Sequence, residues 1–220
     1  RSPEFKKIAE LVRLQHNRLK ARSSVVSAYL LRRAINPNLI LKNISDIVTR
    51  LGARRRDKGL HEVFTELQRF AVLEKIINTP DKYELLEGYY FSLSEKAMCN
   101  KSSLFWLQYA MCRLANGNFK GAEMYFSNAK SLAKGNIKET TDVNNHFARL
   151  LLDSRTEGSE YSDYFDAFHL AHRILIDQIN KDTNRHFPFR QAIRYVDFIS
   201  FRKKDLTTEQ IQRFSNCCKQ

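Results

Sequence analysis

The chain has 220 residues, and its 37 Lys and Arg against 24 Asp and Glu give a formal net charge of +13 at pH 7. Only 7 Gly and 4 Pro are present, and 4 cysteines occur without a CxxC pair, which excludes collagen-like, low-complexity and disulfide-rich chains and argues against a turn-rich β-sandwich. Because no apolar run approaches the ~18 residues that cross a bilayer, we expect a soluble, cytoplasmic, helical protein with reduced thiols.

The first residues read as a leader from cloning rather than as part of a fold. Residues 1–5, Arg-Ser-Pro-Glu-Phe, resemble a translated cloning site, and the chain has no initiator Met. We therefore expect a fragment of a longer protein. Helices are predicted over about 5–21 and 24–35, Asn36-Pro37 marks a break, and Gly52 closes the next helix.

Helical signals continue through the rest of the chain. Apolar residues recur at i, i+3, i+4 and i+7 over 60–77, which predicts one apolar helix face. Thr79-Pro80-Asp81 predicts the start of a helix near 81–98, and Ser102 caps another over 103–116. A capping-box pattern starts at Thr207. We expect about eleven helices and an all-α fold.

The positive charge is concentrated in the first quarter of the chain. Residues 1–60 hold 15 Lys and Arg against 4 Asp and Glu, whereas residues 61–220 hold 22 against 20. Such a basic region predicts contact either with nucleic-acid phosphates or with an acidic partner domain. A base-stacking platform is missing, since no aromatic residue lies between Asn36 and Leu60. The residues of this predicted contact are Arg32, Arg33, Arg50, Arg54, Arg55, Arg56 and Lys58.

The segment 104–129 has the spacing of a two-helix repeat. An aromatic residue is followed by a small one, a Gly-containing turn, and then small and aromatic residues on a second helix. Small residues let two antiparallel helices approach, and aromatic residues fill the spaces between units. The residues that carry this pattern are Trp106, Ala110, Gly117, Asn118, Phe119, Ala122, Phe126 and Ala129. The segment resembles a tetratricopeptide repeat, although Tyr109 and Arg113 depart from the usual residues.

Two further helix pairs are predicted after this repeat. One pairs 146–153 with 161–180, and the other pairs about 188–202 with 207–216. Because about three stacked pairs are needed to bury the apolar faces, we expect a short tetratricopeptide-like solenoid of helical hairpins over 99–220. It would follow a basic helical region over 6–98.

Several segments together resemble the region downstream of the ATPase core in bacterial STAND-type NTPases, many of which act in anti-phage defence. They are residues 21–30 (ARSSVVSAYL), the repeat with Trp106, residues 145–152 (NHFARLLL), residues 171–176 (AHRILI) and residues 187–190 (FPFR). The resemblance implies a helical sensor that binds a foreign protein or other trigger, while the ATPase of the parent protein oligomerises and switches on an effector. No GxxxxGK[ST] loop is present, so nucleotide binding is not implied for this chain.

Candidate chemistry is sparse in the sequence. His169 and His172 share a helix face with Asp166 and would begin a metal site, but surface histidines are the commoner explanation. The other histidines have no fixed spacing to a Ser or Cys, and His146 reads as a structural or docking residue. Phe105, Trp106 and Tyr109 would line a ligand site, although this spacing more often serves core packing. We therefore predict no catalytic residue, cofactor or metal.

Two functions of different classes remain. The first is a protein-interaction or sensor module that binds a protein or peptide, within a larger STAND-type defence ATPase through which it would oligomerise. The alternative is a nucleic-acid-binding helical domain that uses the basic N-terminal region, with affinity that falls steeply with salt. Neither function requires the chain itself to be an enzyme or to contact a membrane.

Overall fold

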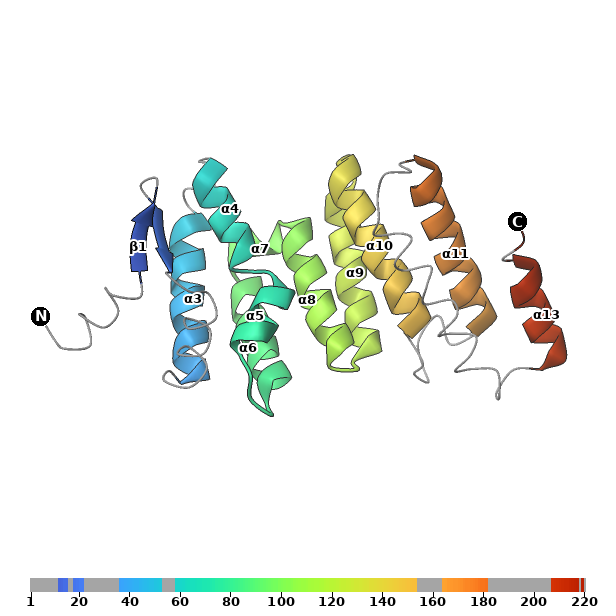
Figure 1. The fold of residues 1–220 in the computed structure, drawn as a ribbon, viewed down its shortest axis with the longest axis horizontal. Coiled ribbons are helices and arrows are strands. Elements are labelled where there is room, and N and C mark those ends of the chain that lie inside the picture. Colours follow the sequence, from blue (N-terminus) through green and yellow to red (C-terminus); the bar gives the residue numbers. More distant parts are fainter. Residues whose placement is uncertain are drawn as a thin grey trace, which may run out of the picture. The chain divides into compact units, whose positions relative to one another are not determined.

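The computed structural model describes residues 12–15, 18–21, 36–52, 58–153, 164–181, 207–217 and 219 (Figure 1). These residues form ten α-helices and one short antiparallel pair of strands. The all-α class is thus confirmed for the bulk of the described chain. It divides into two compact units, Arg1–Tyr89 and Tyr90–Gln220. The predicted boundary between 98 and 99 stays a prediction.

The prediction of a helix over 5–21 is wrong where the structure describes this segment. Strand β1 (Val12–Gln15) pairs antiparallel with β2 (Arg18–Ala21). The register sets Leu14 opposite Leu19. Apolar and polar residues alternate with period two in both strands, a pattern that favours a strand over a helix.

Helix α3 (Pro37–Gly52) begins and ends where the sequence predicts. Asn36 caps it, since its side-chain oxygen accepts a hydrogen bond from the Asn38 amide at 2.9 Å, and Pro37 takes the first helical position, where no N–H is needed. A buried apolar stripe follows at helical spacing. It consists of Ile40, Leu41, Ile44 and Val48. The predicted helix over 24–35 lies outside the described residues.

The apolar run at 60–77 forms two helices and not one. Helix α4 (Lys58–Glu66) and helix α5 (Phe70–Ile76) are separated by a tight turn. A residue far away in the sequence stabilises this turn, because the Tyr89 hydroxyl donates a hydrogen bond to the Leu67 carbonyl at 3.0 Å. Buried Gln68 also donates its side-chain amide to the Phe64 carbonyl at 2.8 Å. These two bonds satisfy backbone carbonyls at the break, which lowers the cost of interrupting the helix.

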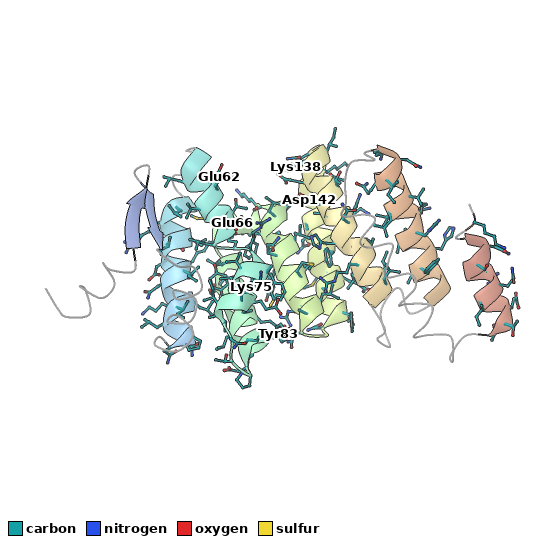
Figure 2. All side chains as sticks on the ribbon, viewed as in Figure 1. Glu62, Glu66, Lys75, Tyr83, Lys138 and Asp142 are labelled. Carbon is teal, nitrogen blue, oxygen red and sulfur yellow. The ribbon has the colours of Figure 1, made fainter. Side chains whose placement is uncertain are left out.

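Helix α6 (Lys82–Ser94) contains the boundary between the two units and ends four residues before the predicted 98. A short helix, α7 (Ala97–Asn100), follows it. Within the first unit, Glu74 of α5 accepts hydrogen bonds from the Tyr83 hydroxyl at 3.0 Å and from Lys82 at 3.5 Å. Lys75 and Tyr83 are labelled on these helices in Figure 2. This contact ties α5 to the start of α6.

Helices α8 (Ser103–Ala115) and α9 (Phe119–Ala133) form a tight hairpin at the predicted place. Ser102 caps α8 by accepting from the Phe105 amide at 3.3 Å, as predicted. Gly117 adopts φ 75°, and the amides of Gly117 and Asn118 donate to the carbonyls of Leu114 and Arg113, which is a Schellman ending. Asn118 then caps α9 by accepting from the Gly121 amide at 2.9 Å.

Helix α10 (Ile137–Asp153) starts nine residues before the predicted 146, because Asn136 caps its first turn. The Asn136 side chain accepts from the Glu139 amide at 3.2 Å and donates to the Glu139 carboxylate at 2.8 Å. Ser103 also donates to this carboxylate, which links the first turns of α8 and α10.

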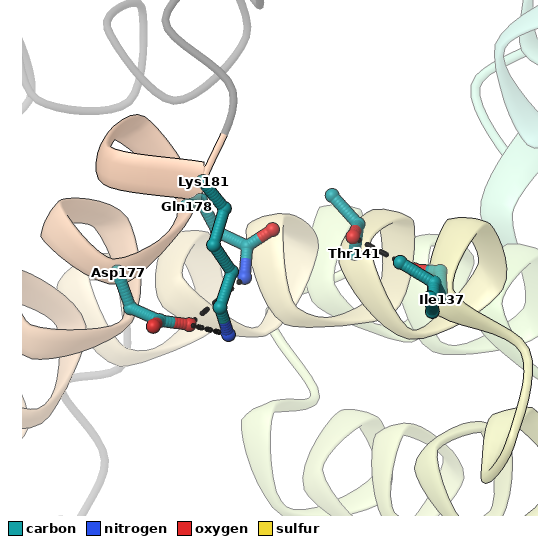
Figure 3. A network of polar contacts seen from close by, with 5 residues as sticks. All are labelled: Ile137, Thr141, Asp177, Gln178 and Lys181. Carbon is teal, nitrogen blue, oxygen red and sulfur yellow. Dashed lines mark hydrogen bonds and ion pairs between the residues drawn. The ribbon is translucent and has the colours of Figure 1, made fainter.

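Helix α11 (Tyr164–Lys181) packs against α10, as the predicted second pair requires. Figure 3 shows Lys181 bonded to Asp177 at 2.8 Å on α11, and Thr141 bonded to the Ile137 carbonyl at 2.8 Å on α10. Helix α13 (Thr208–Cys217) begins directly after Thr207, as predicted. The predicted helix over 188–202 lies outside the described residues.

The second unit therefore contains packed helix pairs of the kind found in helical arrays. Helix α10 packs against both helices of the preceding hairpin, α8 and α9, and then pairs with α11 (Figure 1). Helix α10 thus packs on the pair before it, as successive units of a helical array do. No helix among the described residues is long and apolar enough to span a membrane.

Enlarging a side chain where α8 meets α9 is expected to destabilise the hairpin. Ala122 is fully buried, so Ala122→Leu should lower the free energy of unfolding by about 1–3 kcal/mol through overpacking, measured by urea unfolding followed by circular dichroism. Ser127→Leu, at an exposed position of the same helix, is the matched control and should stay within about 0.5 kcal/mol of wild type. Equal stability of the two variants would contradict this packing.

Candidate functional site

Six side chains of the second unit form one connected group, which we call the aromatic–arginine cluster. It is centred on the stacked rings of Tyr109 on α8 and Tyr125 on α9, whose centroids lie 4.1 Å apart with an interplanar angle of 26°. Offset stacking of this kind is worth about 0.5–1.5 kcal/mol beyond the buried area. The members are Tyr90, Phe105, Trp106, Tyr109, Arg113 and Tyr125.

The base of the cluster is part of the hydrophobic core. Tyr90 lies in the C-terminal part of α6. Its ring stacks on that of Tyr109, with 5.3 Å between the centroids, and lies tilted against that of Phe105, with 6.0 Å between the centroids. All three residues are at least 99% buried. The other members, Trp106, Arg113 and Tyr125, are only partly buried, so this part of the cluster reaches the surface.

Trp106 lies at the edge of the cluster and is neither core nor fully exposed. Its indole N–H donates to the Asn100 carbonyl at 2.7 Å, at the end of α7. Its ring centroid lies 5.2 Å from that of Tyr125, and 5.3 Å from that of Phe105 in an edge-to-face arrangement. Because the polar N–H is already bonded, the partly exposed Trp106 side chain offers mainly apolar surface.

Arg113 completes the cluster one turn after Tyr109. Its guanidinium carbon lies 5.6 Å from the Tyr109 ring centroid and 5.9 Å from that of Tyr125, within cation–π range. An Nη atom also donates to the Tyr109 hydroxyl at 3.4 Å. Burial and the bond to Tyr125 raise the pKa of Tyr109 to about 12, against the opposing effect of Arg113. Tyr109 therefore stays protonated at neutral pH.

The sequence predicts only some members of this cluster, namely Phe105, Trp106 and Tyr109. Phe105 and Tyr109 lie in the core, in agreement with the packing interpretation, whereas Trp106 is partly exposed. Among the other predicted packing residues, Ala110, Ala122, Phe126 and Ala129 are almost completely buried. The sequence does not predict Tyr125 as a partner of Trp106. The contact of Tyr109 with Arg113 is also not predicted, although their i, i+4 spacing on one helix is a signal for it.

The predicted basic contact surface falls mostly outside the described residues. Arg32, Arg33, Arg54, Arg55 and Arg56 are not described, nor is the side chain of Lys58. Arg50 is exposed on α3. Residues 58–89 hold four Lys and Arg against six Asp and Glu, of which Glu62 and Glu66 lie along α4 in Figure 2. The described helices of the first unit thus do not carry the positive excess.

The structure does not place further metal ligands beside His169 and His172 among the residues that it describes. His169 is exposed and His172 is half-buried, with its ring stacked on Phe168 at 6.2 Å. The side chain of Asp166 is not described. Within the described ranges, no group of three or more His, Cys, Asp or Glu side chains is placed to hold a metal ion.

Two cysteines are free thiols in the core. Cys99 and Cys112 are fully buried. Burial raises the pKa of Cys99 to about 11, despite the opposing charge of Lys96. A protonated, buried thiol is a poor nucleophile, so Cys99 has the properties of a packing residue.

Comparison with known proteins finds no matching family model, no similar curated protein and no similar solved structure. The described geometry therefore carries the functional argument on its own. What it provides is a rigid, partly exposed surface of Trp, Tyr and Arg side chains.

His146 on α10 is expected to make folding pH-dependent. Burial, helped by the nearby Arg149 charge, lowers its pKa from 6.5 to about 4. Because the unfolded chain binds this proton more tightly, the stabilisation is complete above pH 6.5 and is lost as the pH falls toward 4, by about 2 kcal/mol between pH 7 and pH 5.

Urea unfolding of wild type and His146→Gln at pH 7 and pH 5 measures this effect. The variant should lose less stability than wild type over this interval, by the same amount of about 2 kcal/mol. The same loss in both proteins would show that folding does not lower the pKa of His146.

Proposed function

We propose that this chain is a protein-interaction module that binds a protein or peptide through the aromatic–arginine cluster. The observation that carries the proposal is the joint presentation of Trp106, Tyr125 and Arg113, all partly exposed, on one hairpin. Trp, Tyr and Arg are the residues most enriched at the energetic centres of protein interfaces.

The support beneath these side chains favours binding. A hydrogen bond to Asn100 of α7 positions Trp106, and a hydrogen bond to Tyr109 positions Arg113. Side chains that are already held lose little conformational entropy when a partner binds. A partner therefore meets a preorganised surface, and the packed helix pairs that carry it suit the extended or helical ligands of helical arrays.

The finer identity of the module is also part of the proposal. The packing of α10 on α8 and α9 is consistent with tetratricopeptide-like stacking. The segments that resemble STAND-type NTPases support a role as the cytoplasmic trigger-sensing part of a defence ATPase, with oligomerisation and nucleotide chemistry supplied by the parent protein. In this proposal the chain itself is not an enzyme and needs no cofactor.

The nucleic-acid alternative has less support. It depends on the basic N-terminal region, and of its residues the structure describes the side chain of Arg50 alone. The cluster has mutually packed rings, whereas single-stranded nucleic acids stack their bases on separate aromatic platforms along a basic groove.

Selection from a random peptide library displayed on phage tests the proposal with the full chain. Peptides enriched on wild type should bind Trp106→Leu and Tyr125→Leu at least tenfold more weakly, because each variant removes a ring from the surface. Phe91→Ala is the matched control, since Phe91 is 60% exposed but lies outside the cluster, and it should bind as wild type does.

Circular dichroism verifies that each variant is folded. Failure to enrich any peptide family would contradict the proposed function. Enriched peptides that bind all four proteins equally would contradict the assignment of the surface.

A further inference from the structure

The turn between α8 and α9 contains the one Asn-Gly pair of the sequence. Of the seven glycines, only Gly117 follows an asparagine, Asn116. Asn116, Gly117 and Asn118 are all exposed. A Cβ placed on Gly117 would meet no atom within 4 Å beyond its two chain neighbours. Water therefore has access to this turn.

An asparagine that precedes a glycine carries two groups that react with each other. The main-chain nitrogen of the glycine attacks the side-chain carbonyl carbon of the asparagine and loses its proton as the new C–N bond forms. Ammonia leaves, and a succinimide ring remains. Water then adds to one of the two ring carbonyls and opens the ring to aspartate or isoaspartate. Glycine favours the attack because it has no Cβ to crowd the nitrogen.

We propose that Asn116 is a site of spontaneous modification, at which the side-chain amide is lost through attack by the Gly117 nitrogen, and that the turn at the end of α8 controls the rate. The net reaction consumes one water molecule and releases one ammonia molecule, without an enzyme or a cofactor. The inference goes beyond the proposed function and does not depend on it.

The folded turn holds the two reacting groups apart. Asn116 has ψ 1°, so the Gly117 nitrogen eclipses the Asn116 nitrogen along the Cα–C bond and lies away from Cβ. Ring closure requires rotation about this bond. The rotation breaks the hydrogen bond from the Gly117 amide to the Leu114 carbonyl at 3.1 Å. It also breaks the bond from the Asn118 amide to the Arg113 carbonyl at 2.9 Å. The reaction therefore proceeds from molecules in which the turn has opened locally.

Both products alter the end of α8. Aspartate places a negative charge at a helix C-terminus, where the macrodipole is itself negative. Isoaspartate carries the chain through the side-chain carbon, which inserts one extra atom into the main chain before Gly117. The bonds of Gly117 and Asn118 back to α8 cannot both keep their geometry after this insertion. We therefore expect the modified hairpin to be less stable.

Mass spectrometry of the full chain measures the modification directly. The chain is stored for several weeks at neutral and at mildly alkaline pH, both folded and in guanidinium chloride, and is then digested with trypsin. Trypsin cleaves after Arg113 and Lys120, so Asn116 and Asn118 lie in the same peptide, residues 114–120. Fragmentation of this peptide assigns the mass change from amide to acid to one of the two residues.

Asn118 is the internal control. It precedes Phe119, which has a bulky side chain, and its own side chain is bonded to the Gly121 amide at 2.9 Å. Asn116 should be modified and Asn118 should not. The rate at Asn116 should rise with pH, because the attacking nitrogen must lose its proton. It should be at least about tenfold higher in guanidinium chloride, where the bonds of the turn are absent.

Asn118→Ala tests whether the turn controls the rate. The variant removes the side-chain cap of α9 next to the turn, so the turn should open more often and Asn116 should react about threefold faster or more. Asn136→Ala is the matched control. It removes the equivalent cap of α10, beyond the far end of α9, and should change the rate by less than about twofold.

Ion exchange separates the modified protein through its added negative charge, and its melting temperature should be lower than that of the unmodified protein. Equal melting temperatures would contradict the effect on the hairpin. The inference would be overturned by an unmodified Asn116 in the folded chain, by equal reaction of Asn116 and Asn118, or by equal rates in the folded and unfolded chain. Equal acceleration by Asn118→Ala and Asn136→Ala would show that global unfolding, and not the turn, sets the rate.

Discussion

The contact between α8 and α9 is the constraint on which the aromatic–arginine cluster depends. Ala110 on α8 and Ala122 and Ala129 on α9 are fully buried, and the two helices pack against each other. Small side chains let helix axes approach closely, and the turn at Gly117 keeps the two helices adjacent. Only at this short separation do Tyr109 and Tyr125 stack, and the stacked pair in turn positions the guanidinium of Arg113.

This arrangement divides the aromatic residues of the hairpin between stability and recognition. Phe105, Tyr109 and Phe126 are buried and stabilise the fold, whereas Trp106 and Tyr125 keep part of their rings at the surface. Rings with two rotatable bonds supply contact area at low entropic cost, particularly when their neighbours already hold them. A surface built in this way recognises a partner without rearrangement of the backbone, in keeping with the interaction function proposed here.

Local signals allowed much of the fold to be predicted, and long-range contacts explain the rest. The start of α3 at Asn36-Pro37, the Ser102 cap and the turn at Gly117 depend on neighbouring residues, so they are legible in the sequence. The break after α4 depends on a hydroxyl 22 residues away, at Tyr89, and no local pattern contains it. Likewise, the pairing of Tyr125 with Trp106 requires the packed hairpin, because the two residues lie on different helices.

A double-mutant cycle between Tyr109 and Tyr125 tests the central claim most directly. The free energy of unfolding is measured in urea for wild type, Tyr109→Leu, Tyr125→Leu and the double variant. Two stacked rings in contact should give a coupling energy of about 1 kcal/mol, so that the double variant is less destabilised than the sum of the single variants. A coupling energy of zero would show that the two rings do not meet, and the close approach of α8 and α9 would then be wrong.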